Sequence, residues 1–179
     1  MSIQIFKRRT VIMLILSITA LLILVGIWYK HTYSMDVAEH IEHNSSYYSQ
    51  KLLIATQGSE FKNALTEEVI ANYKNDSIYI NVIDVTALDK INLNNYNAIL
   101  LLHTWENWKP PVAVEKFVNG LSEIQKNKLV VMTTSGQGTY KMDEVDAITG
   151  ESEIKNMTSI SNQIIEKLNP LLKTENTIN

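Results

Sequence analysis

The chain has 179 residues, of which 45% are hydrophobic and 20% charged, and its formal net charge at pH 7 is −3. This composition is typical of a folded protein, and it excludes a disordered chain and a nucleic-acid binder that works through bulk positive charge. The sequence has no cysteine, which excludes disulfides, thiolate metal sites and cysteine nucleophiles.

An apolar run near the amino terminus is long enough to cross a membrane. Residues 10–29 carry no charged side chain, and about 20 such residues span a bilayer as a helix. Three basic residues at 7–9 precede the run, and Trp28 and Tyr29 end it. A cleaved signal peptide is the alternative, although its apolar core is normally shorter, about 7–15 residues. We expect an uncleaved single-pass anchor, with residues 1–9 in the cytoplasm and the rest of the chain outside.

Residues 30–50 are polar and are expected to form a linker, in which residues 36–43 could form a short helix. His40 and His43 are three positions apart, a spacing that could chelate a metal ion. Two histidines do not complete a metal site, and no third ligand is evident. We therefore predict a solvated linker and no metal centre here.

The remainder alternates between strand-like and helix-like patterns. Apolar, β-branched runs predict strands at 51–56, 78–84, 98–103 and 128–134, with a brief fifth strand at 146–149. Amphipathic patterns predict helices that begin at Ser59 or Glu60, that follow Pro110, and that span 158–172. Such alternation indicates an α/β domain with a doubly wound parallel sheet over residues 51–172. The polar residues 173–179 are expected to be a disordered tail.

The loop after the third predicted strand carries two tryptophans. Ile99 to Leu102 form a continuous apolar run, and Thr104, Trp105 and Trp108 follow it. Open α/β sheets bind ligands at the carboxyl ends of their strands. The two indoles therefore either stack on a flat ligand or cover the end of the sheet.

At this point the pattern resembles the flavodoxin family. The residues that carry the resemblance are Asp84, Leu93, Tyr96, the strand at 97–102, the loop at 103–108, Pro110, Phe117 and Leu121. The resemblance implies a five-stranded flavodoxin-like sheet and an FMN cofactor that transfers electrons. It also implies two ring-contacting loops and a phosphate loop. The implied cofactor-binding residues are Thr56, Gln57, Gly58 and Ser59 in the phosphate loop, and Thr104, Trp105, Thr134, Ser135, Gly136, Gly138 and Tyr140 near the ring.

The phosphate loop departs from the family pattern. Flavodoxins use a run of Thr, Ser, Gly and Asn around the FMN phosphate at a helix start, where free N–H groups favour an anion. Here Gly58 is the only glycine between residues 56 and 62, and Glu60 would repel a phosphate, although Lys62 could offset that repulsion. Glu60 also has a simpler interpretation, as a first-turn carboxylate that stabilises the helix by itself.

Other candidate sites are weaker. His103 at the strand end could act as an acid or base, but without an identifiable nucleophile we expect a hydrogen-bonded structural residue. Ser135 lacks the Gly-x-Ser-x-Gly turn of a serine hydrolase. The acidic residues at 143–146 lack the calcium-loop spacing, so we expect a solvated turn.

Two functional hypotheses follow. The first is a membrane-anchored flavodoxin-like protein that binds FMN and passes electrons to an unknown redox partner. The second is a flavodoxin-like domain without cofactor that serves as an interaction or small-ligand-binding module at the extracytoplasmic surface of the membrane. Fold alone does not separate them.

Overall fold

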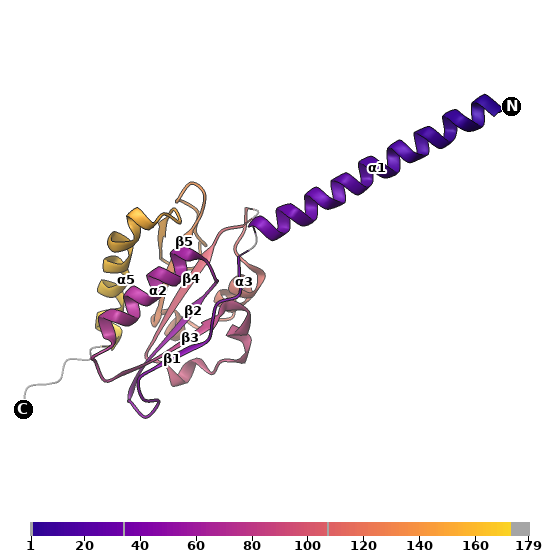
Figure 1. Ribbon diagram of the computed structural model, residues 1–179. Helices are drawn as coiled ribbons and strands as arrows, with labels where there is room; N and C mark the ends of the chain where they lie inside the picture. Colours follow the sequence, from indigo (N-terminus) through magenta and orange to yellow (C-terminus); the bar gives the residue numbers. More distant parts are fainter. Residues whose placement is uncertain (1, 34, 107, 173–179) are drawn as a thin grey trace, which may run out of the picture. The chain divides into compact units, whose positions relative to one another are not determined.

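The computed structural model describes residues 2–33, 35–106 and 108–172 (Figure 1). The chain divides into two compact units, Met1–Met35 and Asp36–Asn179. The tail expected to be disordered, 173–179, lies outside the described residues.

The first unit is the helix α1 (Ser2–Tyr33). Its segment Arg8–Tyr29 has a mean hydropathy of 2.8, and every side chain in that segment is exposed. The segment is therefore long and apolar enough to cross a membrane. A signal sequence near the amino terminus has the same properties.

The second unit contains a six-stranded sheet in the order β1-β3-β2-β4-β5-β6. Its strands are β1 (Ile41–His43), β2 (Gln50–Thr56), β3 (Ile78–Asp84), β4 (Ala98–Thr104), β5 (Leu129–Thr134) and β6 (Ala147–Gly150). Strands β2 to β6 are parallel, and β1 runs antiparallel to β3. When β1 is left out and β2 to β6 are renumbered 1 to 5 along the chain, the strand order becomes 2-1-3-4-5. This is the strand order of flavodoxin-like folds. The predicted α/β class is confirmed, but the sheet has six strands rather than five.

The additional strand lies within the expected linker. Ile41 pairs with Val82 at the outer edge of β3, and the backbones of Asp36 and Gly58 form a separate bridge. The short helix predicted over residues 36–43 is therefore wrong, and residues 36–50 are part of the folded unit. The physical reason is that β3 would otherwise leave a row of unpaired backbone groups at the sheet edge.

The helices cover both faces of the sheet (Figure 1). On one face, α2 (Glu60–Tyr73) and α5 (Met157–Leu172) pack over a core that includes Leu100 and Leu102. On the other face, α3 (Val112–Asn119) and the 3₁₀ helix η1 (Val85–Lys90) pack over a core that includes Ile99 and Leu101. These four residues of β4 are at most 1% exposed, which explains the continuous apolar run in the sequence.

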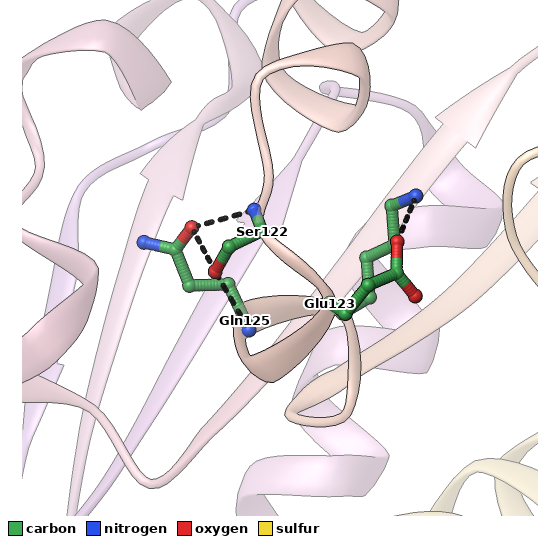
Figure 2. A network of polar contacts seen from close by, with 4 residues as sticks. Ser122, Glu123 and Gln125 are labelled. Atoms are coloured by element: carbon green, nitrogen blue, oxygen red, sulfur yellow. Dashed lines mark hydrogen bonds and ion pairs between the residues drawn. The ribbon is translucent and has the colours of Figure 1, made fainter.

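Short elements complete the connections. The 3₁₀ helices η2 (Leu93–Asn95) and η3 (Ile154–Asn156) precede β4 and α5. Helix α4 (Glu123–Lys126) precedes β5 and begins with a capping box: the Ser122 hydroxyl accepts from the Gln125 amide, and the Gln125 side chain accepts from the Ser122 amide (Figure 2). An ion pair of 3.0 Å joins Glu123 to Lys126. This network stabilises the start of α4, at the end of β5 opposite the candidate site.

Candidate functional site

The carboxyl ends of β2, β4 and β5 meet at one edge of the sheet, as the parallel register requires. Thr56 pairs with Leu102, and Thr104 pairs with Thr134. The hydroxyls of Thr104 and Thr134 lie 2.8 Å apart, and the Trp105 amide donates to the Thr134 carbonyl over 2.7 Å. The structure therefore brings the predicted strand-end residues together.

Lys62 of helix α2 contacts this end of the sheet. It lies in the first turn of α2 and is only 1% exposed. Its ammonium Nζ donates to Thr104 Oγ1 over 2.6 Å and to Ser59 Oγ over 3.4 Å. Burial lowers the pKa of Lys62 from 10.5 to about 8, and the Glu106 carboxylate partly opposes this effect. Lys62 is therefore an internal cation that links the predicted phosphate loop to the end of β4.

Gln57 joins the same two loops. Its side-chain carbonyl accepts from the Thr104 amide over 2.7 Å, and its amide nitrogen donates to the Glu106 carboxylate over 3.1 Å. Gln57 is 8% exposed. Because both ends of this buried side chain are bonded within the chain, Gln57 holds the loops closed against each other.

Gly58 is covered by the segment that precedes β1. Its amide donates to the Asp36 carbonyl over 2.7 Å, and the Asp36 amide donates back to the Gly58 carbonyl over 3.0 Å. A Cβ at position 58 would lie 2.8 Å from that Asp36 carbonyl oxygen. Glycine is therefore required for close backbone packing, and its N–H is directed at Asp36.

The next two loop residues serve the start of α2. Ser59 is the N-cap, and its hydroxyl accepts from the Lys62 amide over 3.2 Å. Glu60 is exposed in the first turn. This position agrees with the simpler interpretation of Glu60, in which its charge stabilises the helix start.

Three aromatic rings gather on the two loops predicted to contact a ring. Trp105 and Tyr140 are stacked, with ring centroids 5.9 Å apart and an interplanar angle of 15°. Trp108 meets the Tyr140 ring edge-on at 6.1 Å and is 80% exposed. Its φ of 66° is rare for a bulky residue. A backbone bridge between Glu106 and Lys109 closes the tight turn that holds it there.

The loop after β5 is a compact turn. The Ser135 hydroxyl accepts from the amides of Thr139 and Tyr140, over 3.2 and 3.5 Å. Gly138 has a φ of 63°, a conformation that glycine adopts without strain. Gly136 is exposed, with open space around its Cα. Ser135 and Gly138 thus shape the turn that places Tyr140 against Trp105.

His103 precedes Thr104 in β4, so the two side chains lie on opposite faces of the sheet. It is 1% exposed, and its Nε2 lies 3.0 Å from the Thr133 hydroxyl. Burial lowers the pKa of His103 to about 4, and the nearby charge of Lys62 acts in the same direction. The imidazole is therefore neutral near pH 7, in keeping with the predicted structural role.

These contacts test whether the residues fit FMN. A phosphate at a helix start needs free backbone donors, but Gly58 donates to Asp36 and the Ser59 hydroxyl is bonded to the α2 backbone. A flavin ring needs space between its aromatic walls, but Trp105 and Tyr140 lie within the range of direct aromatic contact, about 4.5–7 Å. In this arrangement the Gly58 amide is not available to a phosphate, and the stacked rings leave no gap for a flavin between them. Within the described part of the chain, no group of three or more His, Asp or Glu is placed to hold a metal ion.

Sequence reasoning missed Asp36 and Glu106. Asp36 is distant in the sequence and precedes β1, for which the apolar pattern gave no signal. Glu106 lies inside the predicted loop, but its bond to Gln57 depends on how two loops meet. The loop sequence suggests for Lys62 only a charge near a phosphate, although Lys62 falls on the same helix face as Leu65 and Val69, a spacing that indicates burial.

No protein-family model and no curated protein matches the chain. Among solved structures, the chain is similar to a flavodiiron core from Synechocystis sp., with 10% identity, a TM-score of 0.55, and coverage of 72% of this chain and 38% of that one. An archaeal flavodoxin is 14% identical, with a TM-score of 0.45, over 68% and 99% of the two chains. An oxidoreductase from Corynebacterium diphtheriae is 12% identical, with a TM-score of 0.49, over 72% and 99%.

The chain thus spans less than half of the flavodiiron core that it matches. At these identities the likeness concerns the fold alone. Together with the strand order, the flavodiiron match shows that Asp36–Asn179 contains a flavodoxin-like domain.

Proposed function

We propose that this chain is a flavodoxin-like domain that works without FMN, as a small-ligand-binding or interaction module attached to a membrane by α1. The observation that carries the proposal is the buried Lys62 ammonium, bonded to Thr104 and Ser59 between the loops expected to hold the cofactor. In this proposal a fixed internal cation joins loops that a bound anion would otherwise join.

The charges around Lys62 support the same conclusion. The Glu106 carboxylate acts on Lys62 and accepts from Gln57. A phosphate placed near Lys62 would lie close to this carboxylate, and like charges at short range repel each other. FMN binding would also need the Asp36–Gly58 bridge to open and Trp105 to leave Tyr140.

The second candidate function retains FMN. The flavodoxin and flavodiiron neighbours support a possible FMN-related role. Trp105 and Tyr140 belong to the two loops that the flavodoxin resemblance assigns to the ring, and their rings do meet. In this alternative the two rings separate to admit a flavin, and Lys62 turns toward its phosphate.

Membrane attachment is part of both candidates. We infer that Arg8–Tyr29 is an uncleaved anchor with the amino terminus in the cytoplasm, since basic residues precede it and its apolar run is longer than a typical signal-peptide core. A reporter fused after Asn179 tests the orientation. Activity that requires an extracytoplasmic location supports it, and activity only in the cytoplasm contradicts it.

FMN titration separates the two candidates. The full-length protein in detergent micelles is titrated into FMN while flavin fluorescence is recorded, with Trp105→Ala as a second sample. The proposal expects no saturable quenching in either protein. Saturable quenching that Trp105→Ala abolishes would establish the FMN alternative.

A further inference from the structure

A pocket lies beside the Asp36–Gly58 bridge, and both residues of the bridge line it. It has a volume of about 280 Å³ and is bordered by the segment before β1, the first half of α2 and the end of β3. Ligand pockets for drug-sized molecules start at about 300 Å³. The size therefore suits a small molecule or a single side chain, and is too small for a dinucleotide-sized ligand.

The pocket is acidic. Asp36, Glu39 and Glu67 line it, and none of the residues in its lining is basic. These carboxylates do not form a metal-binding group among the described residues, so they are too dispersed for a bare cation. Carboxylates that are not grouped around one point suit an organic cation, in which a charged group is attached to an apolar carbon skeleton.

A buried hydroxyl in the lining gives an independent indication of a ligand. Thr66 is 3% exposed, and its Oγ1 has no hydrogen-bond partner. Thr66 lies in α2, where such a hydroxyl commonly bonds the carbonyl four residues earlier, and this one does not. A buried polar group without a partner costs stability, so its retention at a pocket wall is expected if a ligand supplies the partner.

The other walls suit an alkyl chain. Val82, Ile41 and Val37 also line the pocket; Val82 is 2% exposed and Val37 is 76% exposed. A primary ammonium donates up to three hydrogen bonds, and the Thr66 hydroxyl and a carboxylate of the lining are acceptors for them, while the valines offer apolar contact to the carbon chain. We propose that this pocket binds a primary alkylammonium group, either of a free amine or of a lysine side chain.

The proposal deepens the proposed function by naming a ligand class. The proposed function is tested with FMN, and the pocket is tested with amines. FMN binding would contradict the proposed function whatever the amine result, and failure of amine binding would leave the FMN result unchanged.

Calorimetric titration of the full-length protein in detergent micelles tests the proposal. The probes are n-butylamine, N-acetyl-lysine methylamide and, as the uncharged match, n-butanol. We expect both amines to bind saturably and butanol not to bind. The double variant Glu39→Gln/Glu67→Gln should weaken amine binding about tenfold, as loss of two partly exposed ion pairs implies. Thr66→Val should weaken it about threefold while the protein remains folded.

Glu115→Gln, which removes an exposed carboxylate of α3 outside the pocket, is the matched control and should leave binding unchanged. Tighter binding of the lysine derivative identifies a partner's side chain as the source, and tighter binding of butylamine identifies a free amine. Equal heats for butylamine and butanol, or the same amine affinity in the double variant and the wild type, would overturn the proposal.

Discussion

Lys62 is a buried cation that joins the two loops of the candidate site. A lysine ammonium at 1% exposure is costly unless it is well bonded, and here it is bonded to Thr104 and Ser59. The cost appears as a pKa lowered by burial to about 8. At neutral pH the charged Lys62 side chain joins the two loops through its hydrogen bonds. Above neutral pH its titration makes the stability of the folded chain depend on pH.

Replacing Lys62 tests this electrostatic interpretation. Between pH 8 and the ordinary lysine pKa of 10.5, the unfolded chain binds more protons than the folded one, so the free energy of unfolding of the wild type should rise with pH. We expect a rise of about 1–3 kcal/mol between pH 7.5 and 9.5. In Lys62→Met this rise should be absent.

Urea unfolding of both proteins at the two pH values measures the difference. Tyr73 and Tyr79 interfere little between pH 7.5 and 9.5, because the ordinary tyrosine pKa of 10.0 lies above this range and burial only raises the pKa of both residues further, to about 12. An equal rise in both proteins would show that Lys62 is not the buried cation responsible.

A second prediction at the level of single residues concerns the buried Thr66 hydroxyl. Its hydroxyl is buried without a partner, and Thr66→Val removes that hydroxyl and keeps the shape. We predict that the variant is about 1 kcal/mol more stable than the wild type, as loss of an unsatisfied buried polar group implies. Thermal unfolding measures the shift, and a less stable variant would show that the hydroxyl is satisfied in the folded protein.

At the scale of elements, the segment 36–43 controls the candidate site. Asp36 bridges Gly58, the Ala38 amide donates to the Asp84 carboxylate over 2.8 Å, and Ile41 pairs with β3. The segment thus covers the start of the predicted phosphate loop and forms one wall of the acidic pocket. A change that removes it should alter both sites.

Gly58→Ala is the sharpest way to displace this segment. The added Cβ would lie 2.8 Å from the Asp36 carbonyl oxygen, so we expect a loss of about 1–3 kcal/mol of stability and faster hydrogen exchange at the Ala38 amide. Gly136→Ala is the matched control, because nothing lies within 4 Å of its added Cβ. It should change stability by less than about 0.5 kcal/mol. Similar exchange at Ala38 in both variants would contradict the role assigned to the segment.

At the scale of the whole molecule, the sequence predicts the strands and helices that have a local apolar pattern. Strands β2 to β5 are predictable because buried parallel strands are largely continuous apolar runs, and α5 is predictable because its inward residues recur at helical spacing. Strand β1 was missed, since Ile41–His43 has three residues and only one is apolar. Its pairing depends on the open edge of β3, which is distant in the sequence.

For the candidate site, the positions of the residues could be predicted from the sequence, but their contacts could not. The resemblance placed Thr104, Trp105, Thr134 and Tyr140 at the sheet edge, where the structure also has them. Their contacts could not be predicted, because the bond from Lys62 to Thr104 joins residues 42 positions apart. Whether two loops leave space for a ligand or fill it themselves is decided by tertiary packing.

The affinity of the full-length protein for FMN tests the central claim most directly. After equilibrium dialysis against FMN, bound flavin is measured from the visible absorption of the protein compartment, with a flavodoxin as positive control. We predict no bound flavin beyond that of protein-free micelles, which corresponds to a dissociation constant above about 1 mM. One equivalent of bound flavin at micromolar FMN would contradict the claim that the chain works without this cofactor.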